Sequence, residues 1–148
     1  MDVLASSTFR REPAAVPSAR AFVTKSLESL ALSVDAADRL VLAVAEACNN
    51  VVIHAGGESF GVAIALHERS CHVSVTDQGA GFFAPSGRPA MPSADETGHR
   101  GLALMYALVD SVDLVSTPHG TAVVLVMSLS APATSSAGMP DATRPAGL

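Results

Sequence analysis

The spacing of apolar residues changes near residue 55, from the period of a helix to the period of a strand. Over 17–54 apolar side chains recur every three to four residues, which is typical of amphipathic helices. Over 60–77 they alternate with polar residues, which is typical of half-buried strands. Because helices come before and between antiparallel-type strands, the sequence predicts an α+β fold. We expect a two-layer sandwich with a mixed, mostly antiparallel β-sheet and helices packed on one face.

Start and stop signals set the element boundaries. Pro17 suits a first helical turn, where its missing N–H would have no partner, and Asp35 is a favourable N-cap for the next helix. Gly56 and Gly57 follow the expected end of that helix. The predicted elements are helices over 17–33, 36–54 and 102–110, and strands over 60–66, 71–77, 112–116 and 121–129.

Three segments lack this periodicity. Residues 1–15 are polar, which predicts a flexible N-terminus or an edge strand. The run before the third helix is rich in Gly, Pro, Ser and charge, and a loop of that length usually covers a functional site, so we expect a lid over 82–97. Residues 131–148 contain almost no large apolar side chain and are predicted to be disordered. Residues 16–130 would then form one domain.

The composition narrows the classes of function. Nine Lys and Arg and 14 Asp and Glu give a net charge of -5, which disfavours a groove that binds the phosphates of nucleic acid. Only 4% of residues are aromatic, which disfavours a surface that stacks on bases. Two cysteines are too few for a disulfide framework. No signal peptide and no membrane-spanning apolar run is visible. We expect a cytoplasmic protein without direct contact to nucleic acid or membrane.

Glu46 and Asn50 lie one turn apart in the second predicted helix. At about 100° per residue, both fall on the face opposite the apolar stripe. A solvated face is the ordinary interpretation of such a pair. The alternative is a carboxylate and an amide that together orient a water and hold a hard cation such as Mg²⁺ through oxygen.

Two glycine-rich motifs follow. Asp77 ends a predicted strand and is followed by Gly79 and Gly81, which would allow a ligand to approach the backbone closely while the carboxylate accepts a hydrogen bond. Before the third predicted helix, the segment 97–101 combines backbone N–H groups, a helix dipole and the Arg100 guanidinium, the components of an anion site. Each pattern alone also fits an ordinary turn.

The order of these motifs is specific when they are combined with Gly120-Thr121 at the final strand. The chain resembles the GHKL ATPases, which have the Bergerat fold, and within them the small bacterial anti-sigma factors that are also serine kinases. Residues 46–55 are similar to their N box, 77–81 to their first glycine box and 98–104 to their second. The resemblance covers about residues 16–129, most of the chain.

The resemblance implies ATP and Mg²⁺ as cofactors and a role for each matched residue. Asn50 would bind Mg²⁺ through its side-chain oxygen, and Glu46 would be the base or water-orienting carboxylate of phosphoryl transfer. Asp77 would bind the adenine amine, with Thr121 adding a hydrogen bond at the rim. The glycine-box residues implied to bind the nucleotide are Gly79, Gly81, Gly98, Arg100, Gly101 and Leu102.

The resemblance also implies partners. A protein of this kind sequesters a sigma factor and phosphorylates a serine or threonine of an anti-sigma factor antagonist, a STAS-domain protein, and pairs as a homodimer through its sheet side. Arg20 matches a position near the partner-facing surface.

His99 stands where many relatives have glycine. This difference keeps open a nucleotide-binding interaction module without kinase activity. A detached histidine-kinase catalytic domain is disfavoured, because no helix carrying a phosphorylatable histidine precedes the domain.

Two further groups are expected to be unremarkable in function. His67, Cys71 and His72 fit no zinc spacing, because strand alternation sends Cys71 and His72 to opposite faces. The pair Arg10-Arg11 is expected to be a solvated edge.

Overall fold

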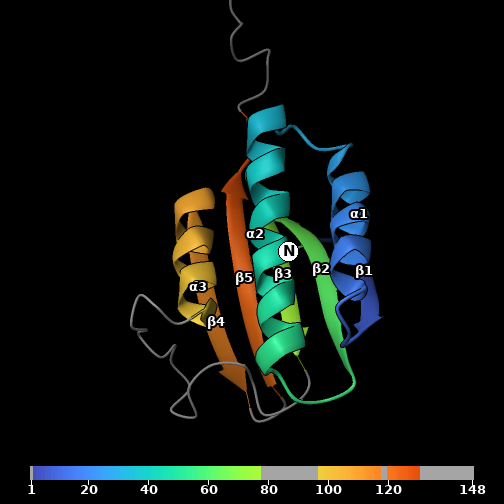
Figure 1. Cartoon of the computed structure of the whole chain (residues 1–148). Helices are drawn as coiled ribbons and strands as arrows, with labels where there is room; N and C mark the ends of the chain where they lie inside the picture. The colour runs from blue at the N-terminus through green and yellow to red at the C-terminus, as the bar shows by residue number, and fades with distance from the viewer. Residues whose placement is uncertain (1, 78–96, 118–119, 131–148) are drawn as a thin grey trace, which may run out of the picture.

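The described part of the chain has two layers, a sheet and a layer of helices on one of its faces (Figure 1). The structure is a computed structural model that describes residues 2–77, 97–117 and 120–130. The predicted tail and all but the last residue of the predicted lid lie outside these residues. The elements are β1 Asp2–Arg10, α1 Ala15–Leu27, α2 Val34–His54, β2 Ser59–His67, β3 Ser70–Asp77, α3 Thr97–Leu108, β4 Ser111–Thr117 and β5 Gly120–Ser128.

The five described strands have the order β1-β2-β3-β5-β4, and all four pairings are antiparallel. The α+β class and the helices on one face are confirmed, whereas the expected mixed sheet is replaced by a purely antiparallel one. The reason is connectivity: hairpins join β2 to β3 and β4 to β5, and after two helices the chain returns as β2 antiparallel to β1.

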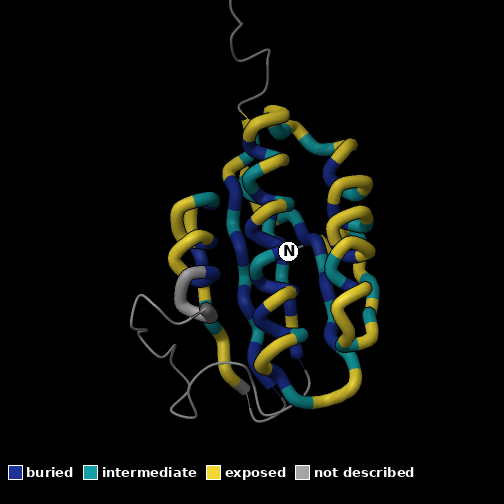
Figure 2. Tube along the Cα trace, in the orientation of Figure 1, coloured by how far each residue is buried: buried dark blue, intermediate teal, exposed yellow. Residues whose placement is uncertain are grey.

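The core lies between the two layers, where buried positions of the strands face buried positions of the helices (Figure 2). Strand burial alternates, as the period of two predicts. Phe9 of β1 contributes by packing against Phe22 of α1 and Phe60 of β2, with ring centroids 6.0 and 5.7 Å apart. The largest fully buried side chains are Phe60, Leu40, Ile64, Met105, Leu125 and Met127.

The first helix is shorter than predicted. α1 begins at Ala15, two residues before Pro17, and ends at Leu27 instead of Ser33. The chain then tightens, because the N–H groups of Glu28 and Leu30 donate to carbonyls three residues earlier. Apolar spacing continues past the helix end because side chains of this turn still pack against the core, so periodicity alone overestimated the helix.

The N-cap of α2 is Ser33, not Asp35. The Ser33 hydroxyl accepts a hydrogen bond from the N–H of Ala36 at 3.0 Å, so the helix begins at Val34. Asp35 falls in the first turn, where its carboxylate is favourable at the positive end of the helix dipole and pairs with Arg39 at 2.9 Å. Both residues are good caps in sequence, and the earlier one is used.

Arg11 is not part of a solvated edge. Its Nε donates to the carbonyl of Gly57 at 2.8 Å and one terminal nitrogen donates to the carbonyl of Val52 at 2.9 Å. Its guanidinium thus satisfies carbonyls at the C-terminal end of α2 and in the loop that leads to β2. Arg10 does match the expectation, since its side chain is 85% exposed and lies 3.9 Å from Glu12.

Candidate active site

The ends of several elements that carry predicted site residues meet at one end of the molecule, the lower end in Figure 1. β2 begins beside the end of β3, because Phe60 pairs with Asp77. β5 begins on the other side of β3, because Thr76 pairs with Ala122. The C-terminal half of α2 and the start of α3 lie over this end of the sheet (Figure 1). Folding therefore brings together motifs that lie far apart in sequence.

Glu46 and Asn50 face α3, not solvent. Asn50 is 7% exposed and Glu46 is half-buried, so the solvated-face interpretation is wrong for this pair. Gly101 of α3 lies directly against both: a Cβ placed on it would be 3.2 Å from Oε1 of Glu46 and 3.4 Å from Oδ1 of Asn50. The helical-wheel position was correct, but the sequence could not reveal that a second helix covers that face. The neighbouring Asn49 is exposed.

α3 starts at Thr97, five residues before the predicted start at Leu102. The backbone of Gly98 and Arg100 therefore belongs to the first turn of α3, where N–H groups have no partner within the helix. Gly101 provides the close approach to α2, and Leu102 is 4% exposed with its side chain in the core. The described structure gives no side-chain position for Arg100.

Asp77 and Thr121 lie side by side on the face of the sheet that the helices cover. The pairing of Thr76 with Ala122 brings Asp77 opposite Thr121 in the next register position. Both are buried, Asp77 at 1% exposure and Thr121 at 5%. At this end of the sheet, the carboxylate can accept hydrogen bonds from a polar ligand, and the hydroxyl can both donate and accept them. Gly79 and Gly81, predicted next to Asp77, lie outside the described residues.

Gly120 was predicted with Thr121 as part of a motif at the final strand, but without a role of its own. Its φ is +148°, and a Cβ there would overlap the carbonyl oxygen of Asp77 and lie 3.2 Å from its Oδ1. The need for glycine arises from the approach of β5 to β3, which no local signal announces.

Cys71 and His72 lie on opposite faces of β3, as strand alternation predicts. No group of three or more His, Cys, Asp or Glu that could hold a metal occurs among the described residues. Cys71 is fully buried, whereas His72 lies on the other face of β3, 3.0 Å from the Ser70 hydroxyl. Burial and the neighbouring His67 lower the pKa of His72, an effect that Asp113 opposes.

No helix in the described residues is long and apolar enough to span a membrane.

The residues present fit Mg²⁺ and a nucleotide. The amide oxygen of Asn50 and the carboxylate of Glu46 offer oxygen ligands, which Mg²⁺ prefers, and both lie against Gly101, where a side chain on α3 would crowd them. The start of α3 supplies backbone N–H groups of the kind that bind phosphate.

Fold and site together define an ATPase domain of the GHKL class, with helices over an antiparallel sheet and the motif residues gathered at one end. The family described as histidine kinase-like ATPase domain matches residues 9–127, and the chain belongs to this family.

Two similar proteins extend the comparison. The serine-protein kinase RsbW of Halalkalibacterium halodurans is 33% identical over 109 residues, which cover 67% of this chain and 65% of that relative. The chain thus spans about two thirds of this relative's length. A crystal structure of the RsbU and RsbW domains of Rv1364c from Mycobacterium tuberculosis superposes with a TM-score of 0.63 at 22% identity, covering 86% of this chain and 33% of the other. At that identity the likeness bears on the fold alone.

Proposed function

We propose that this chain is an anti-sigma factor and an ATP- and Mg²⁺-dependent serine/threonine protein kinase. It sequesters a sigma factor and phosphorylates an anti-sigma factor antagonist of the STAS-domain type. The observation that carries the proposal is the contact of Gly101, near the start of α3, with the buried Asn50 and the half-buried Glu46. Membership of the ATPase family and similarity to a protein named serine-protein kinase support the reaction class.

The phosphate end of the nucleotide is assigned to α2 and α3. Asn50 would hold Mg²⁺ through its amide oxygen, and a bound Mg²⁺ would neutralise charge on the phosphate oxygens. The free backbone N–H groups in the first turn of α3, which contains Gly98 and Arg100, would donate hydrogen bonds to the phosphates. Gly101 and Leu102 follow at the start of the next turn and would keep this first turn packed close to α2 and the core. Phosphoryl transfer depends mainly on such positioning and charge neutralisation.

Glu46 is assigned as the base. Its carboxylate lies beside Asn50, so a serine hydroxyl that approaches the phosphates would be within reach of it. Accepting the hydroxyl proton would let the serine oxygen attack the terminal phosphoryl group while ADP leaves. Its half-buried position is suited to a group that must meet a substrate protein.

The base end of the nucleotide is assigned to the floor of the sheet. Asp77 would accept a hydrogen bond from the exocyclic amine of adenine, and Thr121 would add one at the rim. Gly79 and Gly81, after β3, would give the base room.

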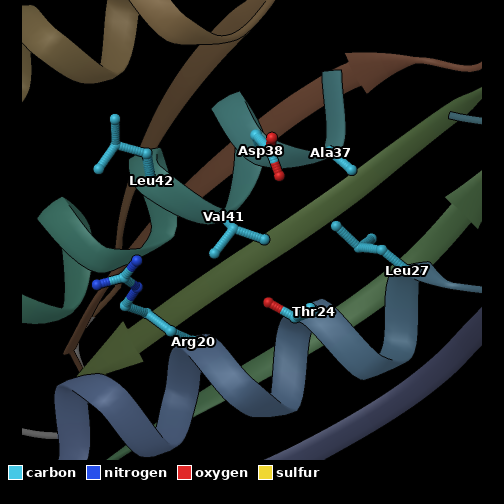
Figure 3. A pocket seen from close by; sticks show the side chains of 7 residues that line it. All are labelled: Arg20, Thr24, Leu27, Ala37, Asp38, Val41 and Leu42. Carbon is cyan, nitrogen blue, oxygen red and sulfur yellow. The ribbon is translucent and has the colours of Figure 1, made fainter. Parts of the chain in front are cut away.

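The partner surface is assigned to the groove between α1 and α2 (Figure 3). This groove, of about 320 Å³, has an apolar floor that includes Leu27 and Val41, with Arg20 and the 41%-exposed Leu42 at one end. Exposed Asp38 also lines the groove, so an acidic residue of a partner segment would pair best at the Arg20 end. We expect Arg20→Ala to weaken sigma-factor and antagonist binding at least tenfold while ATP affinity stays within about twofold. Arg10→Ala, at another exposed arginine, one outside the groove, should change neither.

A homodimer is assigned to the face of the sheet that no described helix covers. A shallow furrow of about 410 Å³ crosses this face, and its small side chains would let a second sheet approach closely. It is lined by residues of β1, β2 and β3, including Ser6, Thr8, Gly61, Ala63, Ser74 and Thr76. Sedimentation of Ser74→Arg should report a monomer if this face pairs.

The test of the kinase is phosphate transfer from labelled ATP to each antagonist-like protein of the same genome. Asn50→Ala should reduce transfer at least a hundredfold, because the cation ligand is lost. The matched control is Asn49→Ala, one residue away and exposed, which should leave transfer within about twofold. Equal transfer by both variants, or no ATP binding with Mg²⁺ by the wild type, would refute the proposal.

A second function is favoured by His99, which replaces a glycine of the second box. The chain would then bind nucleotide and partners without transferring phosphate. Glu46→Gln distinguishes the two: it should abolish transfer by a kinase, whereas in an interaction module it should leave both partner binding and regulation intact. Measurable transfer by the wild type eliminates the module.

A further inference from the structure

Gly120 is the first residue of β5 and has a backbone conformation that residues other than glycine rarely adopt. Its φ is +148°. A Cβ built on it would overlap the carbonyl oxygen of Asp77 and lie 3.0 Å from the carbonyl carbon and 3.2 Å from Oδ1 of the same residue. Two independent constraints, dihedral angle and contact, therefore require glycine at this position.

The contact involves both the backbone and the carboxylate of Asp77. Backbone atoms here cannot shift cheaply, because Asp77 pairs with Phe60 on one side while Thr76 is held by Ala122 on the other. The Asp77 side chain is also confined, at 1% exposure. A side chain at Gly120 would accordingly displace the Asp77 carboxylate, the start of β5, or both.

We propose that Gly120 is a positioning residue that sets the base selectivity of the nucleotide site by fixing where the Asp77 carboxylate points. The inference rests on the proposed assignment of Asp77 to the base. Adenine presents an amine donor at the position where guanine presents a carbonyl acceptor. A carboxylate accepts hydrogen bonds and offers none when ionised, so a fixed Asp77 favours adenine and repels guanine. A displaced carboxylate loses much of that discrimination.

The experiment measures ATP and GTP affinities, both with Mg²⁺, for the wild type and for Gly120→Ala. The ratio of the two affinities should fall about tenfold or more in the variant, the equivalent of one misplaced hydrogen bond to a charged group. Gly61→Ala is the matched control within the same sheet. A Cβ on Gly61 meets only the Ser7 carbonyl oxygen at 3.9 Å. Gly61 lies on the sheet face proposed for dimer pairing and not at the nucleotide site, so a change in pairing should leave the ATP-to-GTP ratio of this variant at the wild-type value.

The selectivity ratio separates positioning from stability. A variant that merely destabilises the fold lowers both affinities by the same factor and leaves the ratio unchanged, and that result would overturn the proposal. The Asp77→Asn background gives a second check: if Gly120 acts through the carboxylate, adding Gly120→Ala to Asp77→Asn should not change the ratio further. A further tenfold change there would also count against it.

Two more measurements decide the question if Gly120→Ala fails to fold or the wild type binds no nucleotide. Asp77→Glu keeps the charge but moves the carboxylate by one methylene in a space closed by Gly120. Its ATP-to-GTP ratio should fall, and an unchanged ratio would overturn the proposal.

A wild type that binds no nucleotide would refute the proposed function alone. The test is then the carboxyl ¹³C chemical shift of Asp77 in the ligand-free protein. This shift should differ from that of the wild type in Gly120→Ala or Gly120→Ser, and should equal it in Gly61→Ala. Equal shifts would refute the positioning role.

Discussion

At the scale of single residues, the described site depends on glycines that allow close approach. Gly101 meets side-chain ends, whereas Gly120 meets backbone, and the two should respond differently to the same added methyl group. Side-chain oxygens can move by a few tenths of an ångström, but a carbonyl in a paired strand cannot. Substitution at Gly101 should therefore disturb chemistry more than folding.

Gly101→Ala is expected to slow phosphate transfer about tenfold or more, while the Kd for ATP stays within about threefold. The new Cβ would lie 3.2 Å from Oε1 of Glu46, so the carboxylate must shift away from its place beside Asn50. Single-turnover transfer and equilibrium ATP binding, measured on one preparation, separate the two quantities. Gly61→Ala is the control, and an equal loss in rate and affinity would show that Gly101 supports binding instead.

Arg11 and Arg10 provide a matched pair for stability. Arg11→Ala removes two hydrogen bonds to carbonyls at 2.8 and 2.9 Å, and should lower the free energy of unfolding by about 1 to 3 kcal/mol. Arg10→Ala should change it by less than about 0.5 kcal/mol, because the side chain is exposed. Urea denaturation of both variants measures the difference. Equal effects would mean that Arg11 does not hold the end of α2.

At the scale of elements, α2 carries the N box, and its start depends on Ser33. Ser33→Ala should lower the free energy of unfolding by about 1 kcal/mol, because the N–H of Ala36 loses its acceptor. Asp35→Ala should cost less, since Asp35 contributes an exposed pair with Arg39 and a dipole interaction. Urea denaturation of both single variants tests the order. A larger loss for Asp35→Ala would restore the cap predicted from sequence.

The sequence predicts elements better than their ends or their contacts. The four strands from β2 to β5 were predicted within one residue at each end, because alternation is a local pattern that survives in the sheet. β1 was predicted only as one of two alternatives for residues 1–15. Helix ends were less accurate: apolar spacing continued past Leu27, and Ser33 and Asp35 are both good caps. Glu46 and Asn50 were predicted as site residues by motif, but the burial of Asn50 follows from the packing of α3, which is a tertiary contact. The need for glycine at 120 has the same origin.

At the scale of the whole molecule, a layer of helices over a sheet encloses a core between them, and both cysteines lie in it. Burial raises the pKa of Cys48 to about 12 and that of Cys71 to about 11 from a usual value of 9.0. At a pH above 9.0 and below about 11, the unfolded chain has lost most of its thiol protons while the folded protein keeps them. The unfolded state then binds fewer protons, so stability falls as pH rises.

The free energy of unfolding should accordingly be constant with respect to these thiols below about pH 8 and decrease by about 3 kcal/mol in total by pH 10. Urea denaturation at pH 7, 8, 9 and 10 measures the slope, and the double variant Cys48→Ala, Cys71→Ala is the control, because it keeps every other titrating group. The control should lose most of the decline, although each truncation lowers stability at all pH values.

Thiol labelling of the native protein tests the same burial. A thiol reagent at pH 8 should modify the native protein only as fast as the core opens, because both cysteines are fully buried. Fast native labelling, or an equal decline in the double variant, would contradict a closed core between the two layers.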